Sequence, residues 1–121
     1  MAIELSTIMF TDQGDVVPAF GVEEILFNTG IANTLAGNDT ITGTTTEDNG
    51  IGFSNIGTLN TNNGNDIITG RGAGPNGNGI INRGYIDTGD GNDVITGTNS
   101  IVGMGFLNYG GVIDTGNGDD I

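Results

Sequence analysis

An internal repeat of about 27 residues constrains this chain more than any other feature. The heptapeptide at positions 37–43, GNDTITG, returns at 64–70 as GNDIITG and at 91–97 as GNDVITG. One further period along, at positions 118–121, the sequence reads GDDI. A fixed period of this length is typical of solenoids, in which each unit buries its apolar side chains only by stacking on its neighbours.

Two other blocks of the sequence keep the same period. Asn28, Asn55 and Asn82 share this spacing, whereas Asn108 comes one position earlier than the period predicts. One extra residue at Gly111 restores the period. The next block of each unit, at positions 32–34, 59–61, 86–88 and 113–115, is again spaced by the full period. The repeat therefore spans residues 26–121, and residues 1–25 stand outside it.

Each unit contains three short segments in which β-branched residues alternate with small polar ones. Gly, Asn and Asp separate these segments, and the chain as a whole has 24 Gly and 2 Pro. This pattern predicts short strands and turns and leaves no room for long helices. The predicted fold is all-β: a parallel β-solenoid (β-helix or β-roll) with about 27 residues per coil and coils about 4.8 Å apart.

On this three-sided coil, one apolar residue of each strand faces inward. The predicted columns are Leu26, Phe53, Ile80 and Phe106, then Ala32, Leu59, Ile86 and Ile113, then Ile41, Ile68 and Ile95. The repeated asparagines lie two residues beyond the first column and should also face inward. We expect their amides to hydrogen-bond along the axis; a ligand-binding role is the alternative.

The two ends of the chain predict how copies associate. Residues 1–25 are expected to form a cap or a donated strand, because Ile3, Leu5 and Thr7 alternate with polar or small residues. At the other end, residues 115–121 repeat the motif but stop before its inward Ile position. We therefore predict head-to-tail or lateral assembly of the chain with itself.

The formal net charge is −13, from 15 acidic residues against Arg71 and Arg83, with no Lys, His or Cys. Such a chain repels nucleic acid and anionic membranes, so cations are its expected charged partners. No run of about 18 apolar residues occurs, and hence we expect no membrane insertion. Without a His, Cys or Lys to act as base or nucleophile, we expect no enzymatic activity.

The repeated turn carries the chemistry of the chain. Thr88-Gly89-Asp90-Gly91-Asn92-Asp93-Val94-Ile95-Thr96 resembles the nonapeptide Gly-Gly-x-Gly-x-Asp-x-(apolar)-x of the RTX, or hemolysin-type, calcium-binding repeat proteins. The resemblance covers nine positions, a third of each repeat. Thr replaces the first glycine of the motif in all copies, and the second glycine is kept only at Gly89 and Gly116.

The resemblance implies that Ca²⁺ binds between stacked turns. Carried over to this sequence, the ligand of each turn is the aspartate at the motif's sixth position, namely Asp39, Asp66, Asp93 and Asp120. Like charges about 4 Å apart repel by about 4 kcal/mol at an effective dielectric of 20, so stacked carboxylates need a counter-charge. Ca²⁺ takes six to eight oxygen ligands. Further oxygen atoms could come from Asp87, Asp90 and Asp114.

Two interpretations of these aspartates stay open at this point. In the first, the chain is an extracellular structural module, secreted or at the cell surface, stabilised by Ca²⁺ between its Asp turns. In the second, each Asp only caps its own turn by accepting backbone N–H groups, and the chain is a metal-independent, self-assembling fibre or matrix subunit.

Overall fold

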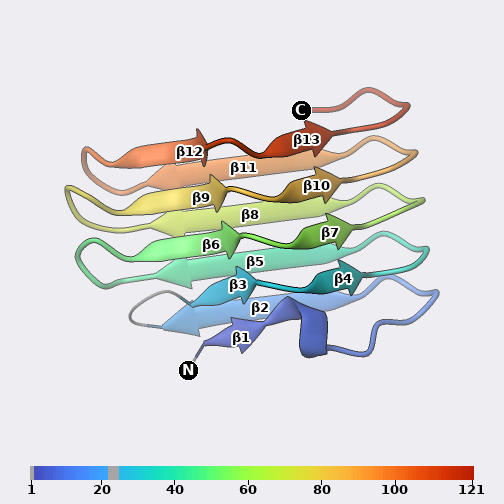
Figure 1. Cartoon of the computed structure of the whole chain (residues 1–121), viewed down its shortest axis with the longest axis horizontal. Helices are drawn as coiled ribbons and strands as arrows, with labels where there is room; N and C mark the ends of the chain where they lie inside the picture. The colour runs from blue at the N-terminus through green and yellow to red at the C-terminus, as the bar shows by residue number, and fades with distance from the viewer. Residues whose placement is uncertain (1, 22–24) are drawn as a thin grey trace.

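The computed structural model describes residues 2–21 and 25–121, which form a stack of parallel coils (Figure 1). A single turn of 3-10 helix, η1 (Leu5–Thr7), accompanies the strands of this part of the chain. The strands are β1 (Ile3–Glu4), β2 (Val16–Gly21), β3 (Leu26–Asn28), β4 (Ile31–Asn33), β5 (Thr40–Thr45), β6 (Ile51–Asn55), β7 (Thr58–Asn60), β8 (Ile67–Gly72), β9 (Asn78–Asn82), β10 (Tyr85–Asp87), β11 (Val94–Asn99), β12 (Met104–Asn108) and β13 (Val112–Asp114).

The strands form three parallel sheets, one on each side of the coil. Their orders are β1-β3-β6-β9-β12, then β13-β10-β7-β4, then β11-β8-β5-β2. Successive strands of a sheet are one coil apart in the sequence, so the chain winds upward from the N-terminus to the C-terminus in Figure 1. Equivalent residues of neighbouring coils, such as Asn28 and Asn55, are 27 residues apart. The predicted parallel β-solenoid and its coil length are confirmed.

The register follows the sequence period, including its one irregularity. Leu59 pairs with Ile86, and Ile86 pairs with Ile113, one full period further on in each case. Between β9 and β12 the offset is 26, as in the pair Asn82 and Asn108. The loop from β11 to β12 is one residue shorter than its counterpart from β8 to β9, and the link from β12 to β13 is one residue longer. Loops absorb the irregularity, and the sheets stay in register.

The predicted inward columns make up the core. Leu26, Phe53 and Ile80 are fully buried, and Phe106 at the end of their column packs partly buried against the same cluster. The second and third columns behave alike: the inner members are buried, while Ile95 and Ile113 in the last coils are partly exposed. Each coil thus contributes only a few side chains, and the core becomes continuous through stacking.

Glycine permits the tight turn that precedes each long strand. Gly64 and Gly91 both have φ of +148°, a conformation that side chains rarely adopt. A Cβ on Gly64 would lie 1.7 Å from the carbonyl oxygen of Gly37, and one on Gly91 would lie 1.6 Å from that of Gly64. The turns can therefore stack at strand spacing only because this position has no side chain.

The N-terminal segment forms the first coil of the same solenoid. β1 pairs with β3, and β2 pairs with β5, with Val17 opposite Ile41. Residues 22–24 of the predicted cap lie outside the described residues. Buried Leu5 belongs to the core. Ile3, Leu5 and Thr7 do not alternate along one strand, because the extended conformation stops at Glu4 and residues 5–7 turn into η1. Donation of this segment to another copy stays a prediction.

Glu4 explains where β1 ends. Its carboxylate accepts hydrogen bonds from the backbone N–H and hydroxyl of Ser6 and from the same two groups of Thr29. Burial raises the pKa of Glu4, but these hydrogen bonds outweigh it and hold the pKa below its ordinary value. The side chain thus turns the chain at Ser6 and fastens it to the second coil.

No helix in the described ranges is long and apolar enough to cross a membrane.

Candidate functional site

The repeated asparagines form the predicted ladder inside the solenoid. Nδ2 of Asn28 donates to Oδ1 of Asn55 at 2.9 Å, Asn55 donates to Asn82 at 2.8 Å, and Asn82 donates to Asn108 at 2.9 Å. The second N–H of each amide reaches backbone oxygen atoms, such as that of Tyr85 for Asn55. An amide carries both donors and an acceptor, so each member of the column can satisfy the next, and Oδ1 of Asn28 at the start of the ladder is buried without a partner. The role of the ladder is structural.

A second polar column, here called the aspartate column, consists of Asp39, Asp66, Asp93 and Asp120. The first three are 1%, 1% and 0% exposed, and Asp120 in the last coil is partly buried. Asp66 precedes Ile68 by two residues, so the alternation of strand β8 turns both side chains to the interior. The same spacing recurs in each coil, which is why the carboxylates stack.

One oxygen atom of each carboxylate links two coils. Oδ1 of Asp66 accepts the N–H of Asp39 at 2.8 Å, and Oδ1 of Asp93 accepts the N–H of Asp66 at 2.8 Å. Asp120 continues the chain at 3.0 Å, and Oδ1 of Asp39 accepts the N–H of Asp15 at 2.7 Å. Each N–H thus belongs to the neighbouring coil, not to the turn of the same Asp. The stacked buried aspartates act as axial links between coils.

Threonine hydroxyls lie beside the second oxygen atoms. Thr34 donates to Oδ2 of Asp39 and also approaches the carbonyl oxygen of Thr61. The Thr61 hydroxyl is 3.1 Å from the carbonyl oxygen of Thr88, and we assign its single proton to that bond. Oδ2 of Asp66 and of Asp93 are then buried without a hydrogen-bond partner.

An unpartnered buried carboxylate holds its proton more tightly than one in water. Burial raises the pKa of Asp66 from 3.8 to about 6. The charges of Asp39 and Asp93 add to the increase, while the hydrogen bond from the Asp39 N–H opposes it. Asp66 therefore gains a proton at a higher pH in the folded protein than in the unfolded chain.

The other three predicted ligands lie on the surface of the solenoid. Asp87 and Asp114 are neighbours on β10 and β13, and each accepts the N–H of the residue two positions later at 3.0 Å. Asp90 is exposed and accepts a hydrogen bond from the Asn117 amide at 2.7 Å. The structure brings together the four aspartates of the column but does not add these three to them.

Few carboxylate oxygens of the aspartate column are free of hydrogen bonds. Ca²⁺ takes six to eight oxygen ligands at 2.3–2.6 Å. Over residues 2–21 and 25–121, no three acidic side chains are grouped so that they could hold a metal ion. Oδ1 of each column member is engaged by a backbone N–H, which leaves Oδ2 of Asp66 and Asp93 as the free buried carboxylate oxygens.

No family model, curated protein or solved structure matches this chain. The stacking of buried aspartates and the solenoid fold are therefore shown by the structure alone.

Two features of the site were not predicted from the sequence. The recurring threonines, noted only as departures from the calcium-binding motif, place their hydroxyls next to the aspartates. Asp15 occupies the corresponding place in the first coil, because Val16 pairs with Thr40. The signal for Asp15 was present, since Gly14-Asp15-Val16-Val17 has the order of Asn38-Asp39-Thr40-Ile41, but its offset of 24 residues is shorter than the period.

Proposed function

We propose that this chain is a non-catalytic structural module, secreted or at the cell surface, whose stacked coils form a rigid support that needs no metal ion. The observation that carries the proposal is the axial hydrogen bonding of the aspartate column and the asparagine ladder. These bonds join every coil to the next inside the protein.

The replacement of the motif's first glycine by threonine supports independence from metal. Thr34 brings a hydroxyl donor to the Asp39 carboxylate, in a place where a calcium-binding turn would need a further oxygen acceptor. The Oδ1 atoms likewise already accept N–H groups. The N–H and O–H donors of the protein thus offset part of the negative charge of the aspartate column.

Thermal and urea unfolding with 5–10 mM CaCl₂ or with excess EDTA test this proposal, with circular dichroism as the readout. We expect the same midpoints in both conditions and no heat of binding in calorimetry. A ligand at about 100 times its dissociation constant would stabilise the fold by about 2.7 kcal/mol per site, which such a comparison detects readily. A lower midpoint in EDTA would contradict the proposal.

Calcium stabilisation is the second candidate, favoured by the free Oδ2 atoms of Asp66 and Asp93. A bound cation would offset both charges at once. Asp93→Asn separates the two candidates, because it removes one of those oxygen atoms but keeps an acceptor for the N–H of Asp66. If Ca²⁺ raises the midpoint of the unchanged protein and not that of Asp93→Asn, the second candidate replaces the first.

The support function includes assembly of copies end to end. Strands β1 and β2 lie at one end of the stack and β11, β12 and β13 at the other, and each is parallel to the other strands of its own sheet. The first coil of one copy could therefore extend the sheets of another. Sedimentation velocity across a hundredfold concentration range should show a mass that rises with concentration, and a constant monomer mass would exclude this assembly.

A further inference from the structure

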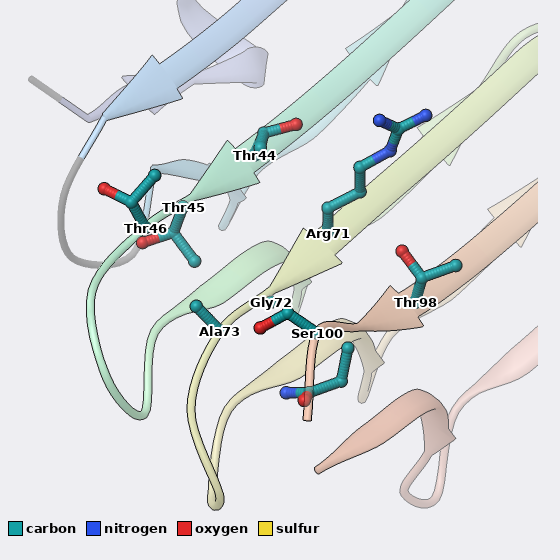
Figure 2. Close-up of a pocket in the computed structure, with 9 residues that line it drawn as sticks. Thr44, Thr45, Thr46, Arg71, Gly72, Ala73, Thr98 and Ser100 are labelled. Atoms are coloured by element: carbon teal, nitrogen blue, oxygen red, sulfur yellow. The ribbon is translucent and has the colours of Figure 1, made fainter. Parts of the chain in front are cut away.

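A groove of about 390 Å³ opens where β5, β8 and β11 end and their turns begin (Figure 2). It crosses three coils and is lined by side chains from equivalent positions of each. Hydroxyl groups line the groove from Thr44, Thr46, Thr98 and Ser100, whereas Thr45 is only 4% exposed. Of the described residues that line it, Arg71 is the only charged one.

The groove exists because the middle coil has the smallest side chains. Gly72 and Ala73 lie where the coil below has Thr45 and Thr46 and the coil above has Asn99 and Ser100. A Cβ on Gly72 would lie 2.3 Å from the carbonyl oxygen of Asn78, so no side chain fits there. The absence of a side chain at Gly72 thus lets β8 pack closely against β9.

Arg71 is an isolated positive charge beside the groove. It pairs in register with Thr44 and Thr98, and Figure 2 shows its side chain extended from the ribbon. In the described part of the chain, its guanidinium forms no salt bridge and no hydrogen bond. Arg83, the other arginine, lies over the Tyr109 ring at 5.8 Å. In a chain of net charge −13, an exposed and unengaged guanidinium offers five donors to a carboxylate.

An exposed aromatic ring lies in line with this arginine. Phe20 on β2 pairs with Thr44, which pairs with Arg71, so the three residues form one row across the outer face of the sheet. Phe20 is 73% exposed. Two strand spacings separate Phe20 from Arg71, a distance of about 10 Å between backbones.

A peptide partner cannot add as a strand at β5 or β8. β5 pairs with β2 and β8 on its two sides, and β8 pairs with β5 and β11, so β2 and β11 are the edge strands of this sheet. Recognition over the middle of this face therefore depends on side chains. An aromatic ring, a row of hydroxyls and one guanidinium match a ligand that has apolar C–H faces, many hydroxyls and a carboxylate.

We propose that this groove and Phe20 bind a glycan carrying an isolated carboxylated sugar. The guanidinium of Arg71 pairs with the carboxylate through two parallel hydrogen bonds, and the threonine and serine hydroxyls bond to the sugar hydroxyls. Phe20 packs against the C–H face of a neighbouring neutral sugar. A densely charged polyanion would be repelled by the acidic chain, so the ligand has few charges.

Calorimetric titration with xylotetraose that carries one glucuronic acid branch, and with unbranched xylotetraose, tests the proposal. We expect the branched sugar to bind more tightly, and Arg71→Gln to weaken its binding by about tenfold or more while leaving the unbranched sugar unaffected. Phe20→Ala should weaken both. Arg83→Gln removes the same charge from another face and should leave binding unchanged.

Circular dichroism of each variant verifies that the exposed substitutions leave the fold intact. The proposal is overturned if neither sugar binds, if both bind equally well, or if Arg71→Gln and Arg83→Gln act alike. It is also overturned if an acidic peptide competes for Arg71 as effectively as the branched sugar. None of these results depends on whether the solenoid needs metal, so the structural proposal is tested separately.

Discussion

Replacing Asp66 by Asn tests the role assigned to the aspartate column. The substitution keeps an oxygen atom that can accept the N–H of Asp39 and removes the negative charge from a side chain that is 1% exposed. It also provides N–H donors next to the Thr61 hydroxyl oxygen. We therefore expect Asp66→Asn to stabilise the protein at neutral pH.

The magnitude follows from the pKa of Asp66, which burial raises from 3.8 to about 6. Two pKa units correspond to about 3 kcal/mol between the charged and neutral forms. Because the folded state binds the proton more tightly, the stabilisation is complete below pH 3.8 and is lost as the pH rises through 6. The unchanged protein should lose roughly 2 kcal/mol of unfolding free energy between pH 4.5 and 7.5 from this group.

Urea unfolding at pH 4.5, 6 and 7.5, followed by circular dichroism, gives the required free energies. At pH 7.5 we expect Asp66→Asn to exceed the unchanged protein by up to about 3 kcal/mol, and to depend less on pH. Asp48→Asn, in an exposed loop, makes the same charge change and should alter stability by less than about 0.5 kcal/mol. The reasoning fails if Asp66→Asn is the less stable protein at pH 7.5 and the unchanged protein gains stability as the pH rises. That result would mean that the fold needs the charged carboxylate, as a cation site would.

Three further substitutions test the packing by urea unfolding. Asn55→Ala should cost about 2–4 kcal/mol, because it leaves buried ladder partners unsatisfied, whereas exposed Asn76→Ala should cost little. Gly64→Ala should destabilise the protein far more than Gly110→Ala. Both residues have positive φ, but only Gly64 faces a carbonyl oxygen, and we expect Gly110→Ala to lower the free energy of unfolding by about 1–2 kcal/mol. Thr34→Val should cost about 1–3 kcal/mol by removing the hydroxyl donor to the Asp39 carboxylate, and equal stability would exclude that bond.

The solenoid could be predicted from the sequence because repetition makes local and global signals agree. Ile41 and Ile68 recur at the coil period, so the same alternation that predicts a strand also predicts which residue stacks on which. Even the shortened interval from Asn82 to Asn108 was informative, since it showed where a loop must absorb one residue. The first coil lacked this advantage: its offset of 24 residues, as from Asp15 to Asp39, does not match the period.

The site was less predictable, because its hydrogen bonds join residues of different coils. The motif suggested a cation between turns or a cap within one turn. In the structure the N–H that each carboxylate accepts lies one coil away, as between Asp39 and Asp66. Alternation from Ile68 does place Asp66 inside, but burying a column of carboxylates conflicts with the usual cost of buried charge. Only the stacked coils reveal which donors reduce that cost.

Strict repetition has opposite consequences for the two polar columns. At a strictly repeated interior position each side chain meets copies of itself, so a polar residue type is tolerated there only if it can be satisfied by its own kind or by the backbone. Asn55 has both donors and an acceptor, and its copies complete one another. Asp66 has only acceptors when charged, so its copies repel, and its Oδ2 remains without a donor. The stability of this solenoid is therefore governed by what neutralises the aspartate column, whether protons, hydroxyl groups or a cation, and the pH dependence of unfolding has a different sign for a proton than for a metal ion.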